Sequence, residues 1–148
     1  MNRALGLVDG EGKFKDIFSA LNVRRAAQEG AKDVGDVHAA PFVLECKDVK
    51  VPAVPAWLRQ AHVEADHAGF PYGVVVHKTR RANVRLGRVH MSVRTWTRVR
   101  LALGLTTSQL RERYGFVSAV RGLDTSRWYL TTDVDRFTQL VADLRARL

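Results

Sequence analysis

An acid, a thiol and a lysine end the apolar run at residues 42 to 47, which reads FVLECK. Side chains alternate across a β-strand, so Glu45 and Lys47 share one face while Cys46 points to the other. A charged group is costly to bury without a partner, so a strand with this ending needs a reason to carry charge. A carboxylate beside an ammonium group suits a site that holds a metal ion and a reacting phosphate.

A second carboxylate can be placed opposite Glu45. A hairpin with its turn at Ala39–Pro41 is indicated by the sequence GDVHAAPFVLECK. A turn centred between residues 40 and 41 pairs residues whose numbers sum to 81, which sets Asp36 across from Glu45. Opposed Cβ atoms lie about 4.5–5.5 Å apart, and two carboxylates that close repel each other unless a cation lies between them. We therefore predict an Mg²⁺ site at Asp36 and Glu45, with Lys47 facing the metal-bound water or the phosphate.

Two other interpretations of this hairpin compete with a metal site. A register shifted by one residue would turn Asp36 to the opposite face. Alternatively, the hairpin lies at a sheet edge, and its charged residues are only solvated or paired. The upstream acid, the turn signal and the apolar approach fit together, and for that reason we favour the site.

Composition points to an anionic partner. The 148 residues include 24 Lys and Arg against 15 Asp and Glu, a net charge of +9, and such an excess favours nucleic acid. One cysteine excludes an intramolecular disulfide and a multi-cysteine zinc site, and the five histidines show no metal-ligand spacing. No apolar run approaches the roughly 20 residues that span a bilayer, and the N-terminus lacks the apolar core of a signal peptide. We expect one domain in the cytoplasm, without a membrane partner.

Periodicity predicts the elements that would position the charged residues. We expect helices at 10–30, 55–69 and 133–148, strands at 73–78 and 127–132, and the hairpin before them. The first helix would bury a stripe of Phe14, Ile17, Phe18 and Leu21. Between residues 79 and 127, VHMSVRTW alternates like a strand and TTSQLRERYGF has a Thr that can cap a helix. The predicted class is α/β, a small mixed central sheet flanked by helices.

These residues resemble a known family, the PD-(D/E)XK nuclease superfamily. GDV followed by FVLECK looks like its D-x(n)-E-x-K core. The wider pattern resembles Holliday junction resolvases of the archaeal type and their phage relatives, and its pieces are EGAKDVGDV, FVLECK, WLRQAHVEA, GVVVHK and RWYLTT. The resemblance covers roughly residues 12 to 80 and 127 to 146 and is strongest from Asp33 to Lys78. It implies a restriction-endonuclease-like fold in a single nuclease domain, residues 1–148.

The resemblance also implies roles for particular residues. Asp36, Glu45 and Lys47 would be catalytic, and Gln60 matches a glutamine that family members often place at the active site. Asp36, Glu45 and the backbone carbonyl of Cys46 would hold Mg²⁺, for which Mn²⁺ can substitute. The Cys46 side chain itself is expected to be a core residue on the back of the strand.

A further acid is often carried on the first helix of the family. Lys15 stands where that acid is expected, which leaves Glu11 and Asp16 as candidates for a metal ligand. Glu64 lies one helical turn beyond Gln60.

Basic residues concentrate after the strand at 73–78. Eight Lys and Arg and no acid lie between residues 78 and 100, with Trp96 among them. A solvated face is the alternative to phosphate contact. Family members join GVVVHK to the last strand by a shorter link, so residues 85–125 look like a basic insertion that grips DNA or a partner subunit. The candidate DNA-binding residues are Arg24, Arg25, Lys78, Arg80, Arg81, Arg85 and Arg88.

The function that these expectations favour is a Mg²⁺-dependent DNA endonuclease, a Holliday junction resolvase acting on four-way junctions as a homodimer. If phage-encoded, it would work in the host cytoplasm. Two alternatives stay open. One is a nuclease of the same superfamily that acts on flaps, ends or specific sites. The other is a non-catalytic basic DNA-binding module whose acids are structural.

Overall fold

One mixed sheet organises the chain. The structure, a computed structural model, describes residues 1–27, 33–79 and 82–147, and for Val84 its backbone only. In these residues the sheet contains seven strands in the order β1-β2-β3-β4-β5-β7-β6. β3 and β4 are parallel and all the other neighbours are antiparallel. The strands are β1 (Arg24–Arg25), β2 (Val37–Ala39), β3 (Phe42–Lys47), β4 (Tyr72–His77), β5 (Arg88–Ser92), β6 (Val117–Ala119) and β7 (Tyr129–Asp133).

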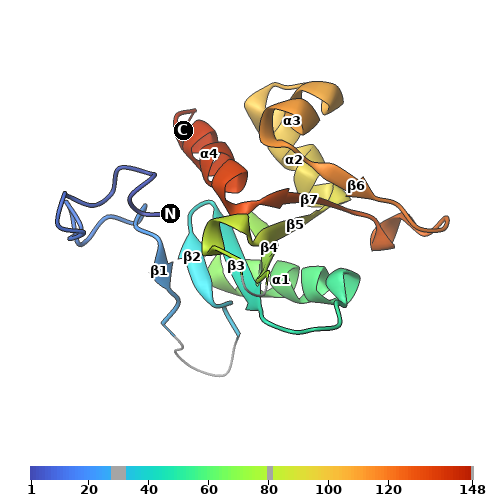
Figure 1. The fold of residues 1–148 in the computed structure, drawn as a ribbon, viewed down its shortest axis with the longest axis horizontal. Coiled ribbons are helices and arrows are strands. Elements are labelled where there is room, and N and C mark those ends of the chain that lie inside the picture. Colours follow the sequence, from blue (N-terminus) through green and yellow to red (C-terminus); the bar gives the residue numbers. More distant parts are fainter. Residues whose placement is uncertain (28–32, 80–81, 148) are drawn as a thin grey trace.

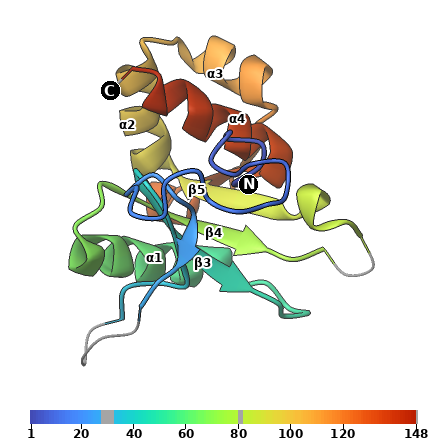
Figure 2. The same ribbon diagram turned by 90° about the vertical axis from the view of Figure 1, so that its left-hand side faces the viewer.

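Helices cover both faces of this sheet (Figure 1). They are α1 (Val54–Ala68), α2 (Val93–Leu103), α3 (Thr107–Tyr114) and α4 (Val134–Arg145), with 3₁₀ turns η1 (Val84–Leu86) and η2 (Thr125–Arg127). α1 lies alone on one face, and the other three helices lie on the opposite face (Figures 1 and 2). The predicted α/β class, a mixed sheet flanked by helices, is confirmed.

Strand alternation builds two separate apolar cores. Phe42 and Leu44 of β3 point toward α4 and join the larger core, which also contains Val74, Val89 and residues of α2, α3 and α4. The smaller core lies under α1 and contains Val54, Leu58, Ala61 and Val75. Because Glu45 and Lys47 alternate with Leu44, they lie on the α1 side of the sheet.

The β3–α1–β4 crossover brings α1 unusually close to the sheet. Pro55 lies in the first turn of α1, and Gly69, in the left-handed conformation at φ 75°, ends it. Gly73 of β4 lies directly under α1, where a Cβ atom would overlap the Ala61 carbonyl. This approach sets the height of α1 over β3, and with it the position of the polar residues on α1.

The hairpin register agrees with the prediction. Val37 pairs with Leu44, His38 with Val43 and Ala39 with Phe42, so each pair sums to 81. The paired ladder stops at Val37. Asp36 follows the same path for one more residue, and its backbone N–H donates to the Leu44 carbonyl at 3.2 Å.

The predicted helix at 10–30 is wrong for the residues that the structure describes. Residues 12–27 have irregular structure apart from an isolated bridge and the short strand β1. Asp9, Asp16 and Ser19 accept hydrogen bonds from backbone N–H groups two residues ahead of them. Such local bonds compete with helical ones. Phe18 is 90% exposed and Ile17 56% exposed, so the expected stripe is not buried. Gly30, the expected end of that helix, lies outside the described residues.

Residues 85–125, which looked like an insertion, contribute to the centre of the fold. They supply β5, which pairs with β4 on one side and β7 on the other. β5 and α2 together replace the single strand suggested by VHMSVRTW. Thr106 caps α3 in a capping box with Gln109, as its sequence suggested. Trp96 is buried in the larger core, at 6% exposure. Within the described residues, none of the helices has the length and apolarity needed to cross a membrane.

Candidate active site

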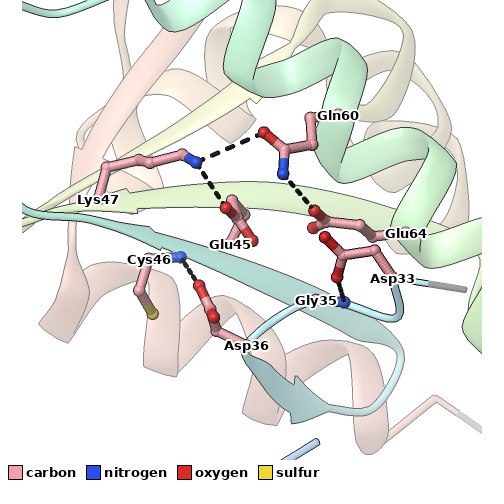
Figure 3. Close-up of polar contacts among 8 residues, drawn as sticks. All are labelled: Asp33, Gly35, Asp36, Glu45, Cys46, Lys47, Gln60 and Glu64. Atoms are coloured by element: carbon pink, nitrogen blue, oxygen red, sulfur yellow. Dashed lines mark hydrogen bonds and ion pairs between the residues drawn. The ribbon is translucent and has the colours of Figure 1, made fainter. Parts of the chain in front are cut away.

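Four polar side chains meet between β3 and α1 (Figure 3). Lys47 Nζ lies 2.6 Å from Glu45 Oε1 and 3.4 Å from Gln60 Oε1. The Gln60 amide in turn donates to Glu64 Oε1 at 2.8 Å. The Lys47 and Glu45 side chains are only 19% and 9% exposed. The sequence placed Glu45, Lys47 and Gln60 at one site, and the structure brings these three together.

Glu64 is the least expected member of this group. It is 1% exposed, although it carries a carboxyl group. Among the described residues no N–H or O–H group donates to its Oε2, because its neighbours there are other carboxyl groups. Burial, a hydrogen bond to Glu45 and the charges of Glu45 and Asp33 raise the pKa of Glu64 to about 8. At neutral pH, Glu64 therefore stays protonated and donates a hydrogen bond to the Glu45 carboxylate.

Gly35 makes room for this carboxyl group. Its backbone has φ +80°, and a Cβ atom there would overlap Val43 and lie 3.3 Å from Glu64 Oε2. Any residue with a side chain would be strained in this conformation and would also crowd Glu64. Gly35 separates Asp33, on the Glu64 side, from Asp36, on the Cys46 side (Figure 3).

Asp36 does not share a contact with Glu45, contrary to the predicted pair of carboxylates. Its Oδ2 instead accepts a hydrogen bond from the Cys46 backbone N–H at 2.8 Å. The cause is the end of the ladder at Val37, beyond which the regular strand geometry no longer directs the side chain. The N–H and C=O of one strand residue point toward the same neighbour. The Cys46 carbonyl, a predicted metal ligand, therefore lies on the Asp36 side of β3.

The donors at this strand end are of the kind that Mg²⁺ prefers. No three His, Cys, Asp or Glu residues of the described chain are grouped closely enough to hold a metal. Mg²⁺, however, usually binds one or two carboxylates and completes its shell with water and phosphate oxygens. Glu45 lies beside the buried Glu64 carboxyl group, whereas Asp36 bonds to the Cys46 N–H and makes no contact with Glu45. The types of donor present suit a hard divalent ion, and their use as a metal site stays a prediction.

Three other expectations about this site need correction or placement. Cys46 is exposed and is not a core residue, because β1 and β2 leave this end of β3 uncovered. Burial of part of the side chain and the nearby carboxylates raise the pKa of the Cys46 thiol to about 11, so it is not an activated nucleophile.

Glu11 pairs with Lys13 at 3.1 Å, and Asp16 closes a local turn. Neither bonds to Asp36, Glu45 or Lys47, because the helix expected to present them does not form.

The candidate DNA-binding residues are dispersed. Arg25 is exposed and lines a hollow with Asp36 and Cys46. The Arg24 guanidinium lies over the Phe14 ring and bonds to the Ile17 carbonyl. Lys78 pairs with Asp48 at 3.1 Å. Arg85 pairs with Asp135 of α4 at 3.0 Å, on the far side of the sheet. Arg80 and Arg81 lie outside the described residues.

Arg88 holds the best position of the set. Cross-strand pairing joins Lys47 to His77 and His77 to Arg88 in one row. Directly paired residues share a face, and adjacent strands are about 4.8 Å apart. Arg88 is exposed on the α1 face, about 10 Å from Lys47. A nucleic-acid backbone that ran along this row from Lys47 would reach Arg88.

Sequence reasoning missed the roles of Asp33 and Glu64. Glu64 did carry a signal, since it falls on the same helical face as Val54, Leu58, Ala61 and Ala65, all of which are buried. An acid on the apolar face of an amphipathic helix is unusual and points to a site. Asp33 gave no comparable signal, because its position depends on the turn at Gly35.

Comparison of the chain with protein-family models, with curated proteins and with solved structures found no match.

Proposed function

We propose that this protein is a metal-dependent DNA endonuclease that hydrolyses phosphodiester bonds at the β3 strand end. One observation carries the proposal. Lys47 is held by Glu45 and Gln60, 2.6 and 3.4 Å away, beside an exposed edge that also presents Asp36. The same residues carry the resemblance to the PD-(D/E)XK nucleases. The net charge of +9 favours a polyanionic substrate.

Each residue has a distinct role in this proposal. Glu45, Asp36 and the Cys46 carbonyl would hold Mg²⁺, which supplies Lewis-acid polarisation of the phosphate and a more acidic bound water. Lys47 orients the attacking water or neutralises charge that develops on the phosphate. Gln60 fixes the Lys47 ammonium group through its amide oxygen and is in turn held by Glu64.

The preferred substrate in this proposal is branched DNA, in particular the four-way junction. Phosphate contacts carry no base sequence, so selectivity would come from DNA shape. A junction presents two symmetric strands, which suits a two-fold dimer that offers one site to each. Both points rest on the resemblance to resolvases and on this physical argument.

Cleavage of labelled DNA tests the proposal. Four-way junction, flap and linear duplex of matched sequence are incubated with and without Mg²⁺. We expect paired nicks near the branch of the junction, dependent on Mg²⁺. Lys47→Ala and Glu45→Gln are expected to lose at least about 100-fold in rate, as do enzymes that lose one charge-stabilising group. Lys13→Ala, which removes an exposed lysine remote from β3, is the matched control.

The results also separate the alternatives. Equal cleavage of junction and linear DNA would reject the preference for junctions and retain the nuclease. Binding to DNA without any Mg²⁺-dependent cleavage would favour a non-catalytic module. One observation favours that second candidate, namely that Asp36 bonds to a backbone N–H and makes no contact with Glu45.

A further inference from the structure

A second hollow lies on the flank of α1 that faces away from Glu64. Its volume is about 530 Å³, within the range of small-ligand pockets. Arg59 and His62 of α1 form one wall, Ser92 and Arg94 at the start of α2 form another, and Ser126 and Trp128 before β7 close it. We call it the α1–β7 hollow.

The charge of the α1–β7 hollow is positive. Arg59 and Arg94 are both exposed, and neither forms a hydrogen bond or an ion pair with any residue that the structure describes. Arg59 interacts electrostatically with Asp124, whose carboxylate already accepts bonds from the Ser126 N–H at 3.1 Å and hydroxyl at 2.6 Å. Two guanidinium groups thus line one hollow with their donors available to an anion.

The rest of the wall is preorganised. His62 Nε2 lies 3.0 Å from the Ser92 hydroxyl, which also caps α2 by accepting from the Thr95 N–H at 3.1 Å. The Trp128 indole N–H donates to the Gly122 carbonyl at 3.3 Å, which fixes the ring. A fixed aromatic ring beside two guanidinium groups is a combination that nucleic-acid-binding surfaces use for a base and its phosphates.

We propose that the α1–β7 hollow binds the sugar–phosphate backbone of a nucleic-acid strand, with Arg59 and Arg94 each neutralising a phosphate and Trp128 packing against a base or sugar. This inference rests on the proposed function for the identity of the ligand. It adds a binding surface remote from the cleavage site, since none of its residues touches Glu45 or Lys47.

The position of the hollow fits a strand that also reaches the cleavage site. The two sites lie on opposite flanks of α1, and a helix with its side chains is about 10–12 Å across. Successive phosphates advance about 3.4 Å along a duplex. A bound arm would therefore place a phosphate at the hollow on the order of three nucleotides from the one at Lys47. Such a contact would orient the DNA over α1 without reading its sequence.

Salt-dependent DNA binding, measured in EDTA so that no cleavage occurs, tests the inference. Fluorescence anisotropy follows a labelled duplex and a labelled four-way junction over a range of KCl concentrations. The double variant Arg59→Gln/Arg94→Gln is compared with Arg111→Gln/Arg147→Gln, which removes the same charge from exposed positions at the opposite face of the sheet. Arg59→Lys/Arg94→Lys keeps the charge and guards against a folding defect, which thermal unfolding also checks.

We expect the hollow variant to flatten the plot of log K against log salt by about 1.8 for duplex, since each lost phosphate contact removes about 0.9. The lysine variant should keep most of the wild-type slope, and the control pair should keep all of it. A hollow variant whose plot stays parallel to wild type would overturn the inference. An equal change in the control pair would do the same, since it would reflect net charge alone.

Two further outcomes separate this inference from the proposed function. Wild-type protein that binds DNA with the expected slope difference, but never cleaves with Mg²⁺, supports the hollow and rejects the nuclease. Displacement of DNA by equimolar inorganic phosphate or a mononucleotide would show a small-anion site and overturn the inference. Failure of the wild-type protein to bind any DNA form would reject both.

Discussion

Replacing Glu64 with glutamine tests the physical basis of the candidate active site. Glu64 is buried at 1% exposure and touches Glu45, and its pKa is raised to about 8 from the ordinary value of 4.5. The unfolded chain gives up this proton near pH 4.5, whereas the folded protein keeps it to about pH 8. Between these values the folded state binds more protons, so its stability falls as pH rises.

The size of this pH effect on the free energy of unfolding follows from the difference between the two pKa values of Glu64. One pKa unit corresponds to about 1.4 kcal/mol, so the loss of stability is at most about 1.4 kcal/mol per pH unit, with a ceiling of about 5 kcal/mol across the window. The Glu64→Gln side chain cannot ionise. Its amide can still accept from Gln60 and can donate to Glu45. The variant is therefore expected to lose this pH dependence and to be more stable than wild type near pH 8.

Urea unfolding in EDTA, at several pH values between about 5 and 8.5, provides the measurement. The matched control is Glu112→Gln, which changes an exposed glutamate on α3 and should retain the wild-type profile. Parallel profiles for wild type and Glu64→Gln would refute the reasoning. They would mean that Glu64 ionises in the folded state as freely as in the unfolded chain, and that the two carboxyl groups do not share a proton.

Two further predictions concern the scaffold of the site. Gly73→Ala should destabilise the fold by about 1–3 kcal/mol and reduce cleavage, because the new methyl group must push the Ala61 backbone away. The control is Gly10→Ala, whose methyl group meets nothing within 4 Å and which should leave the free energy of urea unfolding unchanged. Burial and the charges of neighbouring bases lower the pKa of His90 to about 4 from 6.5. Between these pH values the unfolded state binds the extra proton, so the stability of the fold decreases by up to about 3 kcal/mol as pH drops from about 6.5 to 4. His90→Gln should remove this loss of stability in acid, and an acid unfolding profile identical to that of wild type would contradict the prediction.

Local signals in the sequence were sufficient for the hairpin and for most helices. The turn at Ala39–Pro41 fixes the register of β2 and β3 because neighbouring residues close it, and no distant contact is needed. α1 and α3 have their own stop and start signals, Gly69 and Thr106. Glu45 and Lys47 could be grouped for the same reason, since they lie two residues apart on one strand. Gln60 was expected beside them only because of the resemblance to the PD-(D/E)XK nucleases.

Features that depend on tertiary structure were not predictable in this way. The segment 14–21 has the spacing of an amphipathic helix, but the side chains of Asp16 and Ser19 accept hydrogen bonds from its backbone N–H groups. In addition, Ile17, Phe18 and Leu21 are exposed, so no packing stabilises a helix there. Burial of Glu64 depends on how closely α1 approaches β4 at Gly73. The α1–β7 hollow is formed by three segments distant in sequence, so no local sequence pattern could predict it.

The cost of moving Asp36 decides whether its observed position conflicts with a role at the metal. Asp36 is exposed, and the hydrogen bond that holds its carboxylate is the one from the Cys46 N–H. A hydrogen bond to a charged group is worth about 1.5–3 kcal/mol, and an exposed side chain changes rotamer at little further cost. Asp33 is in a different situation, because Gly35 at φ +80° fixes the turn between them and places Asp33 on the Glu64 side. If a divalent ion were bound beside Glu45 and the Cys46 carbonyl, one charge-neutralising bond from Asp36 to this ion would offset the free energy lost with the hydrogen bond to Cys46. The hydrogen bond to Cys46 is therefore compatible with Asp36 as a ligand, and it keeps the carboxylate beside the carbonyl that would be its co-ligand.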